Sequence, residues 1–295
     1  MKTKTVRTLT LAELEAKFPD EDSCKAYLAS RRWPKGVRCP RCGSDKVYKL
    51  SRSWHWQCRC STSGYRFSVL VGTIFENTNY PLQTWFKVIY LMLSSKKGIS
   101  ALQIHRMIGT GSYSTAWSMC HRIRAGLSNE EFRKLVGFVE VDETFVGGKA
   151  KNKHRDKRGG GRGPSGKTPV VGAVSRGGKV VARVVDNVDT ETLDDFVNET
   201  VSHKVSLIST DDNSGYRFLG DHFNHGVVHH ATGEYVCGAV HTNTIDSFWS
   251  MIKRGIVGTF HKVSKKYLQL YVAEFEFRYN NRKNPDIFGA AIGLC

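Results

Sequence analysis

The sequence lacks the features that would place the protein in a membrane or outside the cell. No stretch reaches the ~18 uninterrupted apolar residues that a membrane span requires. The first residues, Met-Lys-Thr-Lys-Thr-Val-Arg, lack the apolar core of a signal peptide. We therefore expect a soluble, cytoplasmic protein without a membrane partner. Its 295 residues suffice for more than one folding unit.

Acidic residues are scarce relative to basic ones. Lys and Arg number 44 against 27 Asp and Glu, which gives a formal net charge of +17. Charge kept for solubility is the alternative explanation, but solubility seldom needs so one-sided a balance. The excess favours a polyanionic partner, and we expect double-stranded DNA.

The eight cysteines are not spread as a disulfide framework. Four of them form two close pairs, Cys39-Pro-Arg-Cys42 and Cys58-Arg-Cys60, with fifteen residues between the pairs. This spacing is typical of a zinc ribbon, so we predict one structural Zn²⁺ held by these four thiolates. The second pair departs from the usual two-residue spacer by having only one. His55 is the alternative ligand, although an exposed strand histidine is the simpler interpretation.

Residues 100–127 have the pattern of two short helices joined by a turn. Ser100-Ala-Leu-Gln103 is a capping box that opens a helix to Ile108. Gly109-Thr-Gly-Ser112 then makes the turn, and a second helix runs from Tyr113 to Leu127. The pattern predicts a helix-turn-helix that contacts DNA, and an ordinary helical hairpin is the alternative. The side chains that we expect the second helix to expose are Tyr113, Ser114, Ser118, His121, Arg122 and Arg124, of which Ser114, Ser118, His121 and Arg122 are the predicted DNA contacts.

The stretch at residues 147–168 mixes basic residues with glycine. Because it is too polar to pack by itself, we expect it to become ordered on a phosphate backbone. Gly159-Gly-Gly-Arg-Gly163 is not a nucleotide-binding loop, since it has neither Walker spacing nor a strand and helix directly beside it. The side chains expected to bind DNA are Lys149, Lys151, Lys153, Arg155, Lys157, Arg158, Arg162 and Lys167.

Two apolar stretches end in an aspartate, and a helix downstream carries a third acid. The stretches are Phe138-Val-Glu-Val-Asp142 and Val205-Ser-Leu-Ile-Ser-Thr-Asp211. At ~100° per residue, the helix that follows His241 has a polar stripe and an apolar side. The stripe holds Asn243, Asp246, Ser250 and Lys253, and the apolar side holds Ile245, Phe248 and Ile252, with Trp249 between them. Three carboxylates on two strand ends and a helix are what a two-metal site needs.

Two neighbouring acids are left out of this set. Glu143 follows Asp142 in a strand, where alternation points consecutive side chains to opposite faces. Asp212 is the rival of Asp211, and its alternative role is to cap the turn at Asn213.

The predicted organisation is a multidomain α+β chain. The element order β-β-β-α-β-α-β-α after residue 136, with acids after the first and fourth strands and on the last helix, is the ribonuclease H arrangement. The expected divisions are an N-terminal helical segment at residues 1–36, a zinc ribbon at 37–76, a helix-turn-helix region at 77–135, a ribonuclease H-like α/β catalytic domain at 136–262 with its basic loop at 147–168, and a C-terminal helix at 263–295.

An ordered set of motifs gives nearly the whole chain a family resemblance. They are Cys-Pro-Arg-Cys-Gly at 39–43, Val-Gly-Thr-Ile-Phe-Glu at 71–76, Val-Asp-Glu-Thr-Phe-Val-Gly-Gly-Lys at 141–149, Pro-Val-Val-Gly at 169–172, Thr-Asp at 210–211, His-Thr-Asn-Thr-Ile-Asp-Ser-Phe-Trp at 241–249 and Glu-Phe-Arg-Tyr-Asn at 276–280. Each motif is weak alone, and the ordered set is specific. The chain resembles bacterial insertion-sequence transposases of the DDE superfamily that begin with a zinc ribbon, the group related to Merlin elements.

The resemblance implies that Asp142 and Asp211 are catalytic and that the third acid lies on the helix. Where such enzymes often have glutamate, this chain has Asp246, separated from Asp211 by thirty-four residues and followed by Lys253 seven residues later. Some members are described by an asparagine as third residue, which is Asn243 in this chain. Because a hard divalent cation prefers a carboxylate to an amide, we predict Asp246 as the ligand and Asn243 as a neighbour that orients it.

We therefore predict a DNA transposase that binds the terminal inverted repeats of its insertion sequence and catalyses metal-dependent strand cleavage and strand transfer. Two Mg²⁺ or Mn²⁺ ions would be held by Asp142, Asp211 and Asp246, while Lys253 and Arg254 bind phosphates nearby. By resemblance, the ends are brought together by a homodimer or a larger assembly. A catalytically silent DNA-binding protein and a structure-selective nuclease of the same fold are the alternatives.

Overall fold

The computed structural model describes residues 9–60, 64–128, 133–148, 166–228 and 238–295. They form two compact units, Met1–Asn129 with Lys283–Cys295, and Glu130–Arg282. Helices and sheets occur in both sequence halves, so the prediction of a multidomain chain that mixes α and β structure is confirmed. Within the described ranges, the apolar helices are all too short or too polar to cross a membrane.

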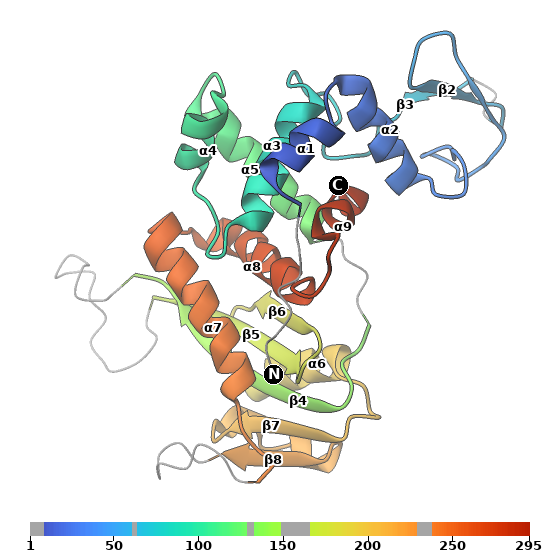
Figure 1. The fold of residues 1–295 in the computed structure, drawn as a ribbon. Helices are drawn as coiled ribbons and strands as arrows, with labels where there is room; N and C mark the ends of the chain where they lie inside the picture. Colours follow the sequence, from blue (N-terminus) through green and yellow to red (C-terminus); the bar gives the residue numbers. More distant parts are fainter. Residues whose placement is uncertain (1–8, 61–63, 129–132, 149–165, 229–237) are drawn as a thin grey trace. The chain divides into compact units, whose positions relative to one another are not determined.

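The first unit is mainly helical (Figure 1). Its helices are α1 (Leu11–Lys17), α2 (Glu21–Arg32), α3 (Leu82–Ser94), α4 (Ala101–Ile108), α5 (Tyr113–Leu127) and α9 (Ile287–Leu294). Helix α1 begins with a capping box, in which the Thr10 hydroxyl accepts from Glu13 N and the Glu13 carboxylate accepts from Thr10 N. The aromatic ring of Phe288 in α9 packs against those of Phe18 and Phe86, so the end of the chain belongs to this core.

The segment at 263–295 differs from the single C-terminal helix that the sequence predicts. It forms α8 (Lys265–Asn280) in the second unit and α9 in the first. The turn before Pro285 separates them, because proline cannot continue a helix from the preceding residues.

A small antiparallel sheet in the order β1-β2-β3 completes the first unit. Its strands are β1 (Val47–Lys49), β2 (His55–Cys58) and β3 (Arg66–Ser68). Trp56 and Phe67 face each other across β2 and β3, with ring centroids 6.0 Å apart, and both are buried. These rings, with Trp33 edge-on to Trp56, are the apolar core of a sheet too small to bury much else.

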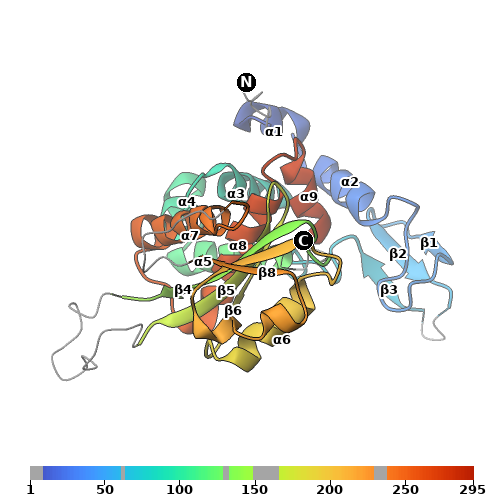
Figure 2. The same ribbon diagram turned by 90° about the horizontal axis from the view of Figure 1, so that it is seen from below.

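The second unit is built on a five-stranded mixed sheet in the order β6-β5-β4-β7-β8. β5 runs antiparallel to β4 and β6, while β4, β7 and β8 run parallel to one another. Helix α6 lies on one face of the sheet, and α7 and α8 lie on the other (Figure 2). The elements are β4 (Phe138–Val146), β5 (Thr168–Ser175), β6 (Val180–Val184), α6 (Thr190–Thr200), β7 (Leu207–Asp211), β8 (His225–Val228) and α7 (Asn243–Gly255).

Side chains of α8 cover the β6 edge of this sheet. The Gln269 and Glu276 side chains accept hydrogen bonds from the Val184 and Ala182 amides of β6, at 2.7 and 3.2 Å. Asn280 both accepts from Val180 N and donates to Val180 O. An unpaired strand edge invites pairing with another chain, and these side chains satisfy it within the unit.

Candidate active site

The strand pairing brings two of the predicted acids together. Parallel pairing of β4 with β7 places Glu140 beside Ser209. Two residues further along, Asp142 reaches the level of Asp211, the last residue of β7. Each of these two residues and Glu143 offers one carboxylate oxygen, and the three oxygens lie within 4.8 Å of one another. Such a group of oxygens is suited to a hard divalent cation.

The structure corrects the exclusion of Glu143. Its side chain does point to the α6 side, where Tyr216 OH donates to Oε2 at 2.8 Å and Asn213 Nδ2 donates to Oε1. However, β7 ends at Asp211, so on that side of β4 no strand separates the two sheet faces beyond that level. A glutamate side chain on either face can therefore reach the group.

Without a cation, burial and mutual repulsion disfavour the charged forms of these carboxylates. Burial, followed by the charges of Glu143, Asp211 and Asp246, raises the pKa of Asp142 from 3.8 to about 8. Burial and the charge of Asp211 also raise the pKa of Glu143. Like charges in a partly dry site disfavour each other's ionisation, and a bound cation reverses that preference.

Helix α7 has the two faces that the sequence predicts. The stripe residues Asn243, Asp246, Ser250 and Lys253 are exposed, and Ile245, Phe248, Trp249 and Ile252 are buried. Thr242 Oγ1 donates to Asp246 Oδ2 at 3.3 Å. The charge of Asp246 acts on Asp142, but its carboxylate lies outside the 4.8 Å group. Whether Asp246 or Asn243 is the third ligand therefore stays a prediction.

Glu140 anchors the start of α7, a role that the sequence analysis did not identify. Its fully buried carboxylate accepts from Thr244 N, Thr244 Oγ1 and Ile245 N at 2.7, 2.8 and 3.0 Å. Arg176 Nε donates to it at 2.7 Å and neutralises its charge. An acid inside an apolar strand was the signal available in the sequence. Because Glu140 precedes Asp142 by two residues, one strand carries both an acid of the group and the anchor of α7.

The four cysteines predicted to bind zinc are not equivalent in the structure. One sulfur from each of Cys39, Cys42 and Cys58 lies within 4.8 Å of the others, with Cys42 Sγ and Cys58 Sγ 3.6 Å apart. Cys60 is exposed and outside this group, and its Sγ lies 3.1 Å from Ser44 Oγ. Cys58 is the last residue of β2, and Cys60 lies in the bend that follows the strand. His55 Nδ1 lies 2.7 Å from Ser53 O.

The face of α5 that was predicted to contact DNA is exposed only near its start. Ser114 and Ser118 are exposed, as is Tyr113. His121 is 8% exposed and stacks on Trp117, so its predicted exposure is wrong, and the same holds for the buried Arg124. Near its end α5 packs against α9, where Gly126 lies against Cys295.

Arg122 has a structural role within the first unit. Its guanidinium donates to Glu76 O at 2.7 Å and lies over the Trp85 ring, so it is half-buried instead of free for DNA. Among the predicted basic contacts of the second unit, Lys167, Lys253 and Arg254 are exposed. The other predicted loop contacts, Lys149, Lys151, Lys153, Arg155, Lys157, Arg158 and Arg162, lie outside the described residues.

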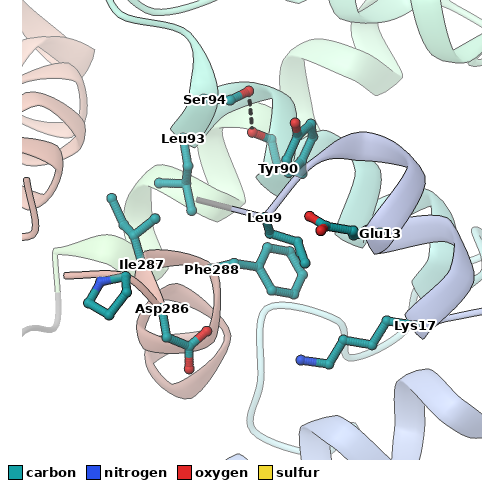
Figure 3. Close-up of a pocket in the computed structure, with 10 residues that line it drawn as sticks. Leu9, Glu13, Lys17, Tyr90, Leu93, Ser94, Asp286, Ile287 and Phe288 are labelled. Atoms are coloured by element: carbon teal, nitrogen blue, oxygen red, sulfur yellow. Dashed lines mark hydrogen bonds between the residues drawn. The ribbon is translucent and has the colours of Figure 1, made fainter. Parts of the chain in front are cut away.

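A cavity of about 470 Å³ lies elsewhere, among α1, α3 and α9 of the first unit (Figure 3). Phe288, Leu93 and Leu9 give it an apolar wall, and Lys17 and Asp286 stand at its margin. Its described lining brings no group of metal-binding side chains together. The carboxylate group of the second unit is therefore the candidate active site.

Comparisons with known proteins agree with this division. Residues 134–280 match the ISXO2-like transposase domain, and residues 19–63 match the transposase zinc-ribbon domain. The chain is 28% identical over 280 residues to an uncharacterized protein in transposable element ISH50 of Halobacterium salinarum, covering 91% of this chain and 94% of the relative. It is 33% identical over 104 residues to an uncharacterized transposase-like protein of Haemophilus influenzae, covering 35% of this chain and 82% of the relative.

Among the solved structures that match is the simian T-cell lymphotropic virus intasome in complex with the PP2A regulatory subunit B56 gamma. The identity is 13%, the match covers 65% of each chain, and the TM-score is 0.29. A score this low does not establish a shared fold.

Proposed function

The chain belongs to the family of ISXO2-like transposases, and from this premise we propose that it binds the ends of its own insertion sequence and cleaves and joins DNA strands. The observation that carries the proposal is the carboxylate group at the ends of β4 and β7. Its oxygens lie within 4.8 Å of one another. Burial, together with the charges of the neighbouring carboxylates, raises the pKa of Asp142 to about 8. Phosphoryl transfer needs a divalent cation at such a place.

The residues present fit Mg²⁺ or Mn²⁺. Asp142 and Asp211 would hold the ions from the strands and Asp246 from α7, with Glu143 as a fourth carboxylate that Tyr216 and Asn213 keep in place. Bound ions would activate a water or a 3′-hydroxyl and stabilise the departing oxygen. Lys253 is exposed on the same stripe of α7 as Asp246, where it can bind a phosphate of the DNA.

We propose that the second unit is ribonuclease H-like. The observed strand order, with an antiparallel second strand and acids on the first and fourth strands, supports this assignment. For the first unit we propose recognition of the DNA ends by the cysteine-containing sheet and by the exposed start of α5, where Ser114 and Ser118 lie. Joining two ends also implies an assembly of at least two chains.

The test is cleavage and joining of DNA that carries the repeats flanking the gene, in Mg²⁺ or Mn²⁺. We expect joined products with the wild type and none with Asp211→Asn or Asp246→Asn, while Asn243→Ala is only impaired. Loss of joined products with Asn243→Ala but not with Asp246→Asn would identify Asn243, about one turn earlier on α7, as the third ligand. Binding of the ends without cleavage by the wild type in either metal would leave a DNA-binding protein and refute the transposase.

The ribbon should hold one zinc ion per chain. Thiolates of Cys39, Cys42 and Cys58 are close enough to share an ion, and removing one of them leaves too few ligands for a structural site. We expect Cys58→Ser to lose the zinc and to unfold the small sheet, as measured by zinc content and near-ultraviolet circular dichroism. Cys120→Ala, at a buried cysteine of the same unit, is the matched control and should keep the zinc.

The variant Cys60→Ser tests whether Cys60 is the fourth zinc ligand. Loss of zinc in that variant supports the four-thiolate prediction, because a serine hydroxyl is a poor zinc ligand. Full retention would show that Cys60 is not a ligand. A wild-type chain without zinc, or Cys58→Ser with a full complement, would contradict the ribbon assignment.

A further inference from the structure

We propose that Trp249 positions Asp142 for metal binding, an inference that rests on the proposed function. The indole Nε1–H of Trp249 donates to Asp142 Oδ2 at 2.9 Å. Trp249 is 2% exposed and comes from the apolar side of α7, whereas Asp142 belongs to β4. Tryptophan has only this one donor, and a buried tryptophan spends it on a specific partner.

Gly172 makes room for this contact. It pairs with Asp142 across β4 and β5. A Cβ atom at residue 172 would lie 2.6 and 2.7 Å from Cη2 and Cζ2 of the Trp249 ring, closer than carbon atoms approach. The indole therefore occupies the space that any other residue at 172 would fill. Asp142, Gly172 and Trp249 come from three sequence motifs that are far apart in the chain and meet at this point. Their contacts explain why these residue types occur at these positions.

The hydrogen bond from Trp249 restrains the carboxylate of Asp142. With the indole N–H on Oδ2, the Asp142 side chain has a fixed direction, and its remaining lone pairs stay available to a cation. Carboxylates that bind metals are commonly held by such outer contacts, and their loss costs roughly 10–100-fold in metal affinity. Trp249 also lies less than one turn after Asp246, so the same helix carries a predicted ligand and the group that orients another.

The test is Mn²⁺ binding, measured by calorimetry without DNA, in the wild type, Trp249→Phe and Trp85→Phe. Trp85 is the matched control, because it is equally buried at 2% and its Nε1 donates one bond, to Thr78 Oγ1 at 2.8 Å, in the other unit. We expect Trp249→Phe to weaken Mn²⁺ binding roughly 10–100-fold and Trp85→Phe to leave it unchanged. Equal affinity in the wild type and Trp249→Phe would overturn the proposal.

A double variant separates positioning from packing. Phenylalanine lacks the outer ring atoms that approach residue 172, so Gly172→Ala places a methyl group in the space that Trp249→Phe opens. We expect Gly172→Ala/Trp249→Phe to recover thermal stability relative to Trp249→Phe without recovering Mn²⁺ affinity. Recovery of affinity together with stability would show that the ring acts only through packing and would overturn the proposal.

Two further outcomes keep this inference apart from the function itself. Should Trp249→Phe fail to fold, Gly172→Ala alone still displaces the indole and should weaken Mn²⁺ binding, and unchanged binding there would overturn the proposal. Absence of Mn²⁺ binding in the wild type, with Asp142→Asn identical to it, would instead refute the metal site and the proposed function with it.

Discussion

Asp142→Asn should abolish DNA cleavage and joining and, without metal, make the protein more stable at alkaline pH. The loss of activity should exceed ~10³-fold, because a bound metal ion contributes several kcal/mol of transition-state stabilisation. Asparagine keeps the shape of the side chain and removes its charge. Asp186→Asn, at an exposed aspartate paired with Lys265, is the control and should retain activity. Residual activity within tenfold of the wild type would contradict the assignment of Asp142.

The gain in stability follows from the pKa of Asp142. Burial and three neighbouring carboxylates raise that pKa from 3.8 to about 8 in the folded chain. Between these pH values unfolding releases a proton, so the metal-free fold loses stability as the pH rises, and the loss is complete above pH 8. Asp142→Asn does not titrate and escapes this loss.

Thermal unfolding in EDTA measures the effect. The advantage of Asp142→Asn over the wild type should be larger at pH 9 than at pH 6, and saturating Mn²⁺ should reverse the order, since only the wild type has the full ligand set. An advantage that is the same at both pH values would show that Asp142 ionises normally in the metal-free fold.

Much of this site could be predicted because its pattern is local. Helical periodicity alone separates the exposed Asp246 and Lys253 from the buried Phe248, and the structure confirms that separation. The range of α5, Tyr113–Leu127, is likewise the predicted one, because a capped start and an apolar period define it. Local rules also identified the strand that ends in Asp211.

The errors concern contacts between segments that are distant in sequence. Glu143 was excluded by strand alternation, a rule that does not consider where the neighbouring strand stops. His121 was expected on the surface because the sequence does not show how α5 packs within the first unit. The position of Cys60 depends on how the chain turns after β2, and spacing alone does not determine it. Glu140 was passed over because its partners lie about a hundred residues away on α7.

Glu140→Ala should cause the largest loss of stability of any substitution in the second unit that leaves the acidic group intact. The buried carboxylate satisfies the first amides of α7 and neutralises Arg176. Its removal leaves the partly buried Arg176 guanidinium without its counter-charge and the first amides of α7 without an acceptor. Breaking one partner of a buried pair costs ~3–5 kcal/mol. For a unit of this size that corresponds to a drop of roughly 10 °C in the unfolding midpoint.

Glu199→Ala is the matched control, because Glu199 also pairs with an arginine, Arg183, but at the surface, with 62% of its side chain exposed. An exposed pair contributes ~0–1 kcal/mol, so this variant should unfold close to the wild type. Arg176 also donates to Ala239 O and His241 O, which hold the segment before α7. Glu140→Ala should therefore weaken Mn²⁺ binding as well, since the helix that carries Asp246 loses its anchor. Equal midpoints for Glu140→Ala and Glu199→Ala would mean that α7 is held by its apolar face alone, and the ion pair of Glu140 with Arg176 would then have no part in positioning Asp246.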